Sequence, residues 1–552
     1  MKFTKQSFVD LLYIPISLVF LYIMFRNYTQ FLDISMVDET GYMELLNFNP
    51  LLYPGGYGPM YSLSYKIVYQ FIPDFINLHY FFVIVLTWLP PLSLFFFLRS
   101  RKVSFVISML FSWLFFITSY IAAFDWWART SHYSITLLFL FLIFINRYRQ
   151  YPLLILAYTF LFFKILSYVR PELNMASYFV LLFLIIIVIY KLVKRKYSKI
   201  NLKLLDKLLL SSLVVVYLSM FLMWKSPTTN TGRMYFALGQ HYTMNYNKWN
   251  GLGRIDFLYW EKIFKEHFGE SKTFSDMYKN NPKETIKHVT ENIKSYIIQT
   301  LDFVSELFLP KVYFKFNYII KWIIIISVIV FFIFRIGWNV YSKILIDKVI
   351  KDFYFLFVVT SFALPSLVAS FVIFPREHYF IMQLPFFIYL FYLILYPLVK
   401  IYNNVLHNKI FTIIVLVILF IGTPHVSKFV RYNNFQTYEY PNYLPYIKAV
   451  RKLHIKKTIN YLHHEINLIY VTKNFKKFGY FSGFPFYDSI IVKDSINMLY
   501  VNNFLFDLKP HQSDSTFSYF MNNYPKLGWQ KLQLEGKRGY IIYKKELLEN
   551  GN

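Results

Sequence analysis

Long apolar runs recur along the whole chain, and they constrain its fold more than any other feature. Each run extends for roughly 18 to 22 residues, the length that an α-helix needs to cross the hydrocarbon core of a bilayer. Of the 552 residues, 56% are hydrophobic and 16% charged, whereas soluble domains carry about 25% charged residues. A soluble globular domain and a disordered chain are both excluded, and the sequence predicts a polytopic α-helical membrane protein.

About eleven runs are long and apolar enough to be transmembrane helices. The first run is too long for the core of a signal peptide and has no small-residue cleavage site after it, so we expect a retained span. The predicted spans cover residues 8–26, 79–98, 103–123, 133–146, 152–169, 175–193, 207–224, 317–335, 353–374, 379–398 and 409–427.

The formal net charge of +28 raises the question of a nucleic-acid partner. The basic residues stand in short clusters beside apolar runs, such as Arg99, Arg101 and Lys102, and not within a nucleic-acid-binding module. We therefore expect membrane lipids, and no nucleic acid, as partners.

The same clusters predict the orientation in the membrane. If the N-terminus is cytoplasmic, the cytoplasmic side holds roughly twenty Lys and Arg, against about five in the short loops of the other side. The loops predicted to be cytoplasmic are 99–102, 146–150, 191–207, 335–351 and 400–409. Three larger segments then lie outside the cytoplasm, at 27–78, 225–316 and 428–552.

The tail at 428–552 differs from the transmembrane domain at 1–427. Its apolar runs shorten to strand length, at 466–471, 490–492 and 540–543, and polar or Gly/Pro turns separate them. We predict a small soluble α/β domain on the extracytoplasmic side, with a terminal hairpin turn at 536–539. The chain has no Cys and no glycine-rich phosphate loop, which disfavours thiolate metal sites and nucleotide-driven transport.

The first outer segment contains two adjacent carboxylates, Asp38 and Glu39, followed by Tyr42. A carboxylate at the membrane surface can act as a general base or hold a divalent cation that neutralises a phosphate. The alternative is a solvated acidic pair at a helix start, with Ser35 or Asp38 as the N-cap. The Pro/Gly/aromatic stretch at 51–60 follows in the same segment.

Further ionisable residues are predicted at the same side of the membrane. Arg170 precedes Glu172, and Arg376 precedes His378 and Tyr379. Either arginine can hold a phosphate through paired hydrogen bonds, or can pair with a neighbouring glutamate and fix a helix end.

Two more outer segments carry polar candidates. Asp125, Trp126, Trp127, Arg129 and His132 stand within eight residues, as an interfacial anchor or a ligand platform. In the segment at 225–316, Gln240 and His241 are candidates for substrate contact or proton transfer, although His241 also fits an ordinary partly buried histidine.

Taken in order, these residues resemble the GT-C superfamily of polytopic glycosyltransferases. The resemblance rests on one N-terminal span, the outer Asp38-Glu39 loop with Tyr42, the Pro/Gly/aromatic stretch, and the Arg-Pro-Glu at 170–172. The Pro-Arg-x-x-Tyr at 375–379 extends it, so that it covers roughly residues 1–400.

The resemblance implies a bacterial inner-membrane or plasma-membrane enzyme that moves a sugar from a polyprenyl-phosphate carrier to a lipid, glycan or protein acceptor. Transfer would occur on the outer face and with inversion. Asp38 would be the base, Glu39 its neighbour or a ligand for a divalent cation (Mg or Mn), and Arg170 and Arg376 would contact the carrier phosphate. A transporter or flippase of lipid-linked glycans, a surface-polysaccharide polymerase or ligase, and a catalytically silent subunit remain the alternatives.

Overall fold

The computed structural model describes most of the chain. The described residues are 9–34, 38–44, 58–124, 129–194, 204–225, 227, 231–252, 260–311, 316–402, 409–438, 443–455, 457–463, 468–472, 474–479, 491–492, 495–501, 514–534 and 539–548.

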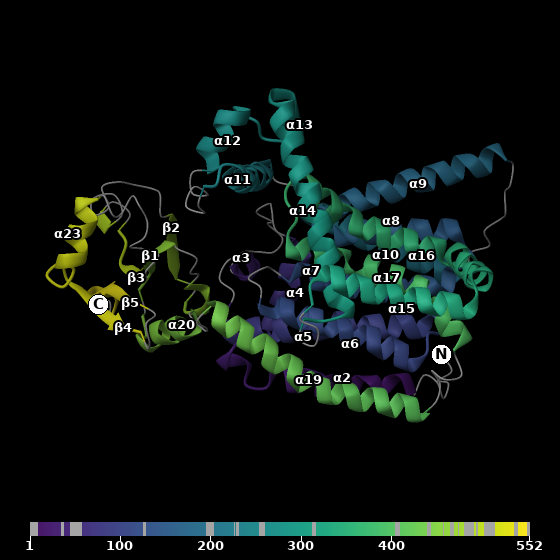
Figure 1. The fold of residues 1–552 in the computed structure, drawn as a ribbon. Coiled ribbons are helices and arrows are strands. Elements are labelled where there is room, and N and C mark those ends of the chain that lie inside the picture. Colours follow the sequence, from purple (N-terminus) through teal and green to yellow (C-terminus); the bar gives the residue numbers. More distant parts are fainter. Residues whose placement is uncertain are drawn as a thin grey trace.

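The chain before residue 439 forms a bundle of helices with smaller helices at one end (Figure 1). The α-helices are α2 (Tyr13–Phe25), α3 (Asp38–Glu44), α4 (Pro59–Tyr69), α5 (Phe75–Ser100), α6 (Phe105–Ile121), α7 (Thr130–Ile145), α8 (Pro152–Leu166), α9 (Leu173–Val193), α10 (Leu204–Trp224), α11 (Thr231–Trp249), α12 (Trp260–Phe268), α13 (Phe274–Asn280), α14 (Pro282–Phe308), α15 (Tyr318–Ile336), α16 (Trp338–Val372), α17 (Glu377–Ile401) and α19 (Lys409–Tyr438). Three short 3₁₀ helices are η1 (Tyr28–Gln30), η3 (Ala122–Phe124) and η4 (Asn146–Tyr148).

Ten of the described helices are long and apolar enough to cross a membrane, namely α2, α5, α6, α7, α9, α10, α15, α16, α17 and α19. The shorter apolar helix α8 falls on the predicted span at 152–169. Helices α9, α10 and α15 bury few of their side chains, so apolar residues such as Ile186, Leu222 and Phe334 lie exposed at the outside of the bundle. Such a surface is stable in lipid and not in water, and the architecture is that of a polytopic helical membrane protein.

The bundle is built on α5, which packs against α2, α6 and α7, and on the pair α16 and α17. Asp74, the N-cap of α5, forms an ion pair with Arg451 of the C-terminal domain, and we call this the domain-side end of the bundle. At the other end, which we call the far end, Arg101 follows α5 and pairs with Asp352 of α16. Since successive helices cross the bundle in alternate directions, the start of α7, the end of α8 and the start of α17 lie at the domain-side end.

The connection predicted at 335–351 is mostly helical. Gly337 has a φ of 88°, which favours glycine, and it separates α15 from α16. Helix α16 then begins at Trp338 and runs for 35 residues. At 1.5 Å per residue this is about 52 Å, well beyond a hydrocarbon core of about 30 Å, so α16 extends past the membrane at the far end.

A small C-terminal sheet with helices beside it is present, as predicted. The C-terminal domain contains α20 (Tyr443–Lys452), α23 (Ser515–Asn523), the 3₁₀ helices η6 (Leu468–Tyr470) and η8 (Lys545–Leu547), and a sheet in the order β2-β1-β3-β5-β4. The strands are β1 (Ile459–His463), β2 (Phe475–Gly479), β3 (Met498–Val501), β4 (Trp529–Gln533) and β5 (Tyr540–Lys544). Strands β1, β2 and β3 pair in parallel, whereas β5 is antiparallel to both β3 and β4.

Two of the three predicted strand positions in this domain are wrong. The run at 540–543 falls in β5, which forms the expected hairpin with β4, although residues 535–538 of its turn lie outside the described residues. The run at 466–471 instead contains the 3₁₀ helix η6, and Ile491 and Val492 form a helical turn. Short apolar runs do not by themselves distinguish a strand from a buried turn.

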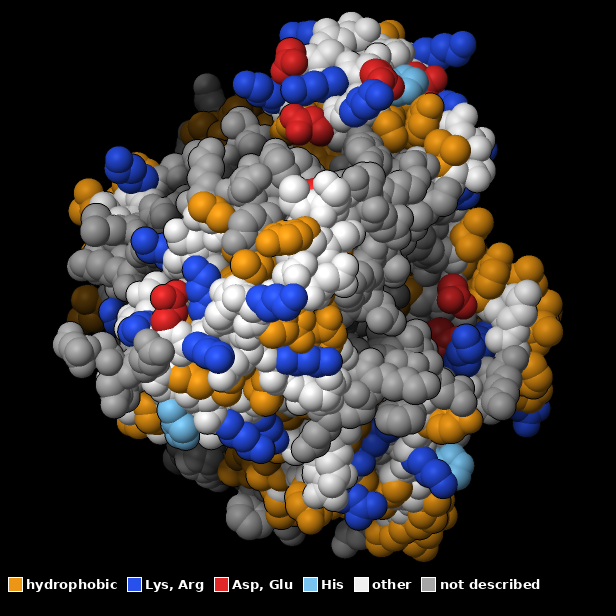
Figure 2. All heavy atoms as spheres, turned by 90° about the vertical axis from the view of Figure 1, so that its left-hand side faces the viewer, with side chains coloured by type: hydrophobic (Ala, Val, Ile, Leu, Met, Phe, Trp, Pro, Cys, Tyr) orange, Lys and Arg blue, Asp and Glu red, His pale blue; other side chains and the backbone are white. Residues whose placement is uncertain are grey.

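The C-terminal domain covers one end of the molecule, as Figure 1 shows, and α19 leads to it from the bundle. The carboxylate of Asp33, which follows α2, accepts hydrogen bonds from the main-chain N–H groups of Tyr443 and Leu444 at 2.9 and 2.8 Å. Asp33 therefore satisfies the free N–H groups at the start of α20 and holds the domain against the bundle. Lys and Arg side chains are spread over this face of the molecule, with hydrophobic side chains between them (Figure 2).

Candidate functional site

Glu39 lies at the domain-side end and is almost completely buried, with 1% of its surface exposed. Its Oε1 accepts hydrogen bonds from the hydroxyl groups of Tyr61, at 2.5 Å, and Tyr65. Its Oε2 accepts one from the main-chain N–H of Arg129 at 2.9 Å. We call Glu39, Tyr61, Tyr65 and Arg129 the Glu39 cluster.

Tyr61 and Tyr65 are four residues apart on α4 and so lie on the same face of that helix. Both hydroxyl groups can therefore reach the same carboxylate. Tyr42 packs the edge of its ring on Tyr61, with ring centroids 4.9 Å apart. Phe82 of α5 stacks on Tyr65 at 3.8 Å. The two hydroxyl groups are thereby held toward the carboxylate by aromatic packing.

Burial sets the protonation of this cluster. It raises the pKa of Glu39 above its ordinary value, and the hydrogen bonds from Tyr61, Tyr65 and Arg129 oppose this change. The pKa of each tyrosine is raised well above its ordinary value by burial and by the Glu39 charge. Both tyrosines therefore stay protonated and act as donors.

The alternative of a solvated acidic pair is wrong for Glu39, because its carboxylate is enclosed by aromatic and main-chain groups. The expected helix start is present, since α3 begins at Asp38. The side chain of Asp38 lies outside the described residues, as do residues 45–57, which include most of the Pro/Gly/aromatic stretch.

Arg129 links this cluster to α6 and α7. Its guanidinium donates to the carbonyl oxygens of Ala122 and Ala123 at 2.9 and 2.8 Å, at the end of α6. Arg129 and His132 are both buried. An interfacial anchor would be exposed at the membrane surface, so neither residue has that role. Residues 125–128, with the predicted Trp126–Trp127 pair, lie outside the described residues.

Arg170 and Glu172 form the predicted ion pair, with Arg170 Nε 2.6 Å from Glu172 Oε1. Arg170 also donates to the hydroxyl group of Ser131, in the first turn of α7. This bond joins the end of α8 to the segment that carries Arg129. The structure thus brings Arg170 and Glu172 to the helix end beside the Glu39 cluster.

A close backbone contact fixes α4 against α8 at the same place. The main-chain N–H of Met60 donates to the carbonyl oxygen of Tyr168 at 3.1 Å. A Cβ atom on Gly58 would lie only 1.9 Å from the carbonyl oxygen of Val169. Position 58 therefore requires glycine, because any larger residue would clash with the main chain of Val169.

His241 and Arg376 form a second group, on α11 and before α17. The His241 ring stacks on Phe374, with centroids 5.3 Å apart, and Nε2 has no hydrogen-bond partner among the described residues. Burial, together with the positive charge of Arg376, lowers the pKa of His241 to about 2. His241 is therefore neutral at physiological pH and a weak base.

The other predicted residues of this group lie close by. His378 and Tyr379 are in the first turn of α17, and the centres of their rings are 4.3 Å apart. Gln240, which precedes His241 in the sequence, is half-buried. Helix α17 packs against α7, and both begin at the domain-side end. The Arg376 group and the Arg170 pair therefore lie at the same end of the bundle, on different elements.

Two features at this end of the bundle could not be predicted from the sequence. Asn245, His288 and Asn292 form a buried polar network in which His288 Nε2 lies 3.1 Å from the carbonyl oxygen of Ile373. This network holds α11 and α14 against the end of α16, and burial lowers the pKa of His288 to about 4. The only sequence signal is the spacing of four residues between His288 and Asn292 on α14.

The second is Tyr470, which η6 inserts from the C-terminal domain between α3 and α5. Its hydroxyl oxygen lies 3.4 Å from Nδ1 of His79. Burial and the charge of Glu39 raise its pKa well above the ordinary value. The C-terminal domain therefore supplies part of the wall around the Glu39 cluster.

Within the described part of the chain, no three His, Asp or Glu side chains gather as a metal site. A divalent cation on Asp38 and Glu39 stays a prediction. No family model, no curated protein and no solved structure matches the chain.

Proposed function

We propose that this protein is a membrane glycosyltransferase that moves a sugar from a polyprenyl-phosphate carrier to a lipid, glycan or protein acceptor. The site lies at the domain-side end of the bundle, and Asp38 is the catalytic base. The charge asymmetry of the sequence supports an extracytoplasmic domain-side end and a cytoplasmic N-terminus, in a bacterial inner or plasma membrane.

One observation carries this proposal, namely the burial of Glu39 by donors from α4 and α7. A buried carboxylate with three donors fixes the backbone of α3, and thereby the position of Asp38, the first residue of that helix. Glu39 acts as a positioning residue, since both of its carboxylate oxygens accept hydrogen bonds from the protein. We assign the role of base toward the acceptor to the neighbouring carboxylate, Asp38.

The chemistry needs a base, a site for the leaving phosphate and a route for a lipid tail. The Asp38 carboxylate takes the proton of the acceptor hydroxyl, whose oxygen attacks the anomeric carbon. The bond from that carbon to the carrier phosphate oxygen breaks, and the polyprenyl phosphate leaves with the electron pair. Arg170 and Arg376, at the same end of the bundle, would balance its charge, while the lipid tail stays beside the apolar helices.

Sugar transfer by purified protein in nanodiscs tests this function. The donors are a panel of radiolabelled polyprenyl-phosphate sugars, and the acceptor is native membrane lipid extract, with and without EDTA. We expect one donor to label a new product, and EDTA to reveal any need for Mg²⁺ or Mn²⁺.

The variant Asp38→Asn should lower this turnover by about 10²- to 10⁴-fold, the usual contribution of a general base, without changing the melting temperature. The matched control is Asp347→Asn, which removes an exposed carboxylate at the far end. Normal turnover of Asp38→Asn would remove Asp38 as the base. Absence of transfer from every donor by folded protein with acceptor present would reject the transferase and favour a transporter, a polymerase or a silent subunit.

A further inference from the structure

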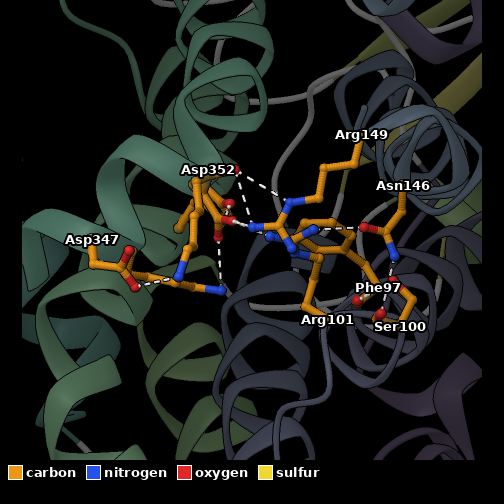
Figure 3. Close-up of polar contacts among 10 residues, drawn as sticks. Phe97, Ser100, Arg101, Asn146, Arg149, Asp347 and Asp352 are labelled. Carbon is orange, nitrogen blue, oxygen red and sulfur yellow. Dashed lines mark hydrogen bonds and ion pairs between the residues drawn. The ribbon is translucent and has the colours of Figure 1, made fainter. Parts of the chain in front are cut away.

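A second buried charge cluster lies at the far end of the bundle, away from the site described above. Figure 3 shows its polar contacts. Its centre is Asp352 of α16, whose side chain is completely buried. The carboxylate pairs with Arg101, with Arg149 at 2.8 Å and with Lys348 at 2.9 Å, and it accepts a hydrogen bond from Tyr389 at 3.0 Å. We call Arg101, Arg149, Lys348 and Asp352 the far-end cluster.

The far-end cluster has three cations and one carboxylate, a formal excess of two positive charges. Arg101 and Lys348 have only 2% and 7% of their side chains exposed, so water screens them little. The nearby Asp347 does not compensate, because it pairs with Lys351 at 2.6 Å. Uncompensated charge at such depth is costly, and an anion would remove much of that cost.

Unused hydrogen-bond donors support the same conclusion. Nε of Arg101 and the hydroxyl group of Tyr392 are buried and have no partner among the described residues. The other guanidinium nitrogens of Arg101 bind Asn146 and Asp352, and its carbon lies 4.3 Å from the centre of the Phe355 ring. Lys348 Nζ lies 5.2 Å from the centre of the Tyr392 ring, so Tyr392 borders the far-end cluster.

One member of the far-end cluster is accessible from outside the protein. Arg149 has 41% of its side chain exposed, and it reaches Asp352 from the connection between η4 and α8. This connection lies at the end of the candidate spans α5 and α7, where we expect lipid headgroups. Two arginines and a lysine suit a phosphate, which has several oxygens for charge-assisted hydrogen bonds.

We propose that the far-end cluster binds the phosphate of an anionic lipid headgroup, with Arg149 and Lys348 in direct contact and Arg101 behind them. Bound phosphate joins α5, the η4–α8 connection and α16, and so stabilises the bundle at this end. The proposal does not depend on sugar transfer.

Lipid binding to the full-length protein tests this proposal. Native mass spectrometry measures the dissociation constants of phosphatidylglycerol and phosphatidylcholine, and a parallel thermal melt measures stabilisation by each lipid and by inorganic phosphate. We expect phosphatidylglycerol to bind preferentially and raise the melting temperature. Arg149→Gln should weaken the binding of phosphatidylglycerol about 10- to 100-fold, since a hydrogen bond to a charged group contributes about 1.5–3 kcal/mol.

Lys343→Gln is the matched control, because it removes an exposed positive charge from the same helix, α16, outside the cluster. Equal weakening by both variants would mean general charge attraction and would overturn the proposal, as would equal binding of the two lipids by wild type. Stabilisation by inorganic phosphate alone, lost in Arg149→Gln, would replace the lipid by a free ion at the same site. The melting temperature of each variant without lipid shows that it is folded.

Discussion

At the residue scale, Glu39 combines burial with a complete set of donors. Two tyrosine hydroxyls and one main-chain N–H surround its carboxylate, and Arg129 also closes the end of α6. A single substitution in this cluster therefore affects α3, α4 and α7 together. Burial, together with the positive charge of Arg376, lowers the pKa of His241 and keeps its ring neutral.

The raised pKa of Glu39 predicts a pH-dependent stability. Between the ordinary value of 4.5 and the higher value in the folded protein, the native state binds more protons than the unfolded state. The free energy of unfolding therefore falls as pH rises through this interval. Melting temperatures of wild type should decline across it, and Glu39→Gln, which cannot ionise, should flatten the decline.

The exposed Glu266 on α12 is the matched position for this experiment. Glu266→Gln should leave the pH dependence of wild type intact. The same slope in wild type and Glu39→Gln would show that other groups cause the dependence.

At the scale of elements, Gly58 sets the distance between α4 and α8. Its main chain lies against the carbonyl group of Val169, and Met60, two residues further on, donates to Tyr168. The N-terminus of α4 cannot move away from α8 without losing this bond. Helix α4 in turn carries the two tyrosines that hold Glu39.

Gly58→Ala should lower the free energy of unfolding by about 1–3 kcal/mol or more, because the new methyl group meets main-chain atoms that cannot rotate away. Gly251→Ala is a useful comparison, since a Cβ there meets nothing within 4 Å, although its φ of 64° adds some backbone strain. Denaturation of the two variants measures both costs. A smaller loss at Gly58 than at Gly251 would contradict the close contact between α4 and α8.

The sequence predicts the elements of this protein better than their contacts. Apolar length is a local property, so the positions of the long helices and of the C-terminal α/β domain follow from it. The ion pair of Arg170 and Glu172 also follows, because the two residues are neighbours in the chain. The contact of Tyr470 with His79 and the pairing of Asp352 with Arg101 do not, because in each case the two residues lie hundreds of residues apart in the sequence.

At the scale of the whole molecule, the C-terminal domain is fixed to the bundle by contacts of unequal strength. The Arg451–Asp74 ion pair is about one-third exposed on both sides, whereas Tyr470 is completely buried. Exposed ion pairs contribute about 0–1 kcal/mol, and truncation of a buried aromatic residue costs about 3–5 kcal/mol. Tyr470 is therefore the main attachment of the two.

Tyr470→Ala should release the domain from α3 and α5, and Arg451→Ala should not. Hydrogen exchange followed by mass spectrometry measures this as faster exchange in α3, in α20 and at the start of α5. Intact protection of α3 in Tyr470→Ala would mean that the Asp33 contact with α20 is sufficient to hold the domain.

The contact of α19 with α2 has a consequence for biosynthesis. Arg431 of α19 donates to the carbonyl oxygen of Met24, at the end of α2, across 407 residues of sequence. At about 5–20 residues per second, a ribosome needs roughly 20–80 s to make the chain between them. Helix α2 therefore stays without its contact to α19 until α19 has been synthesised. The C-terminal domain is made later still, and we expect it to dock only after α2 and α19 have packed together.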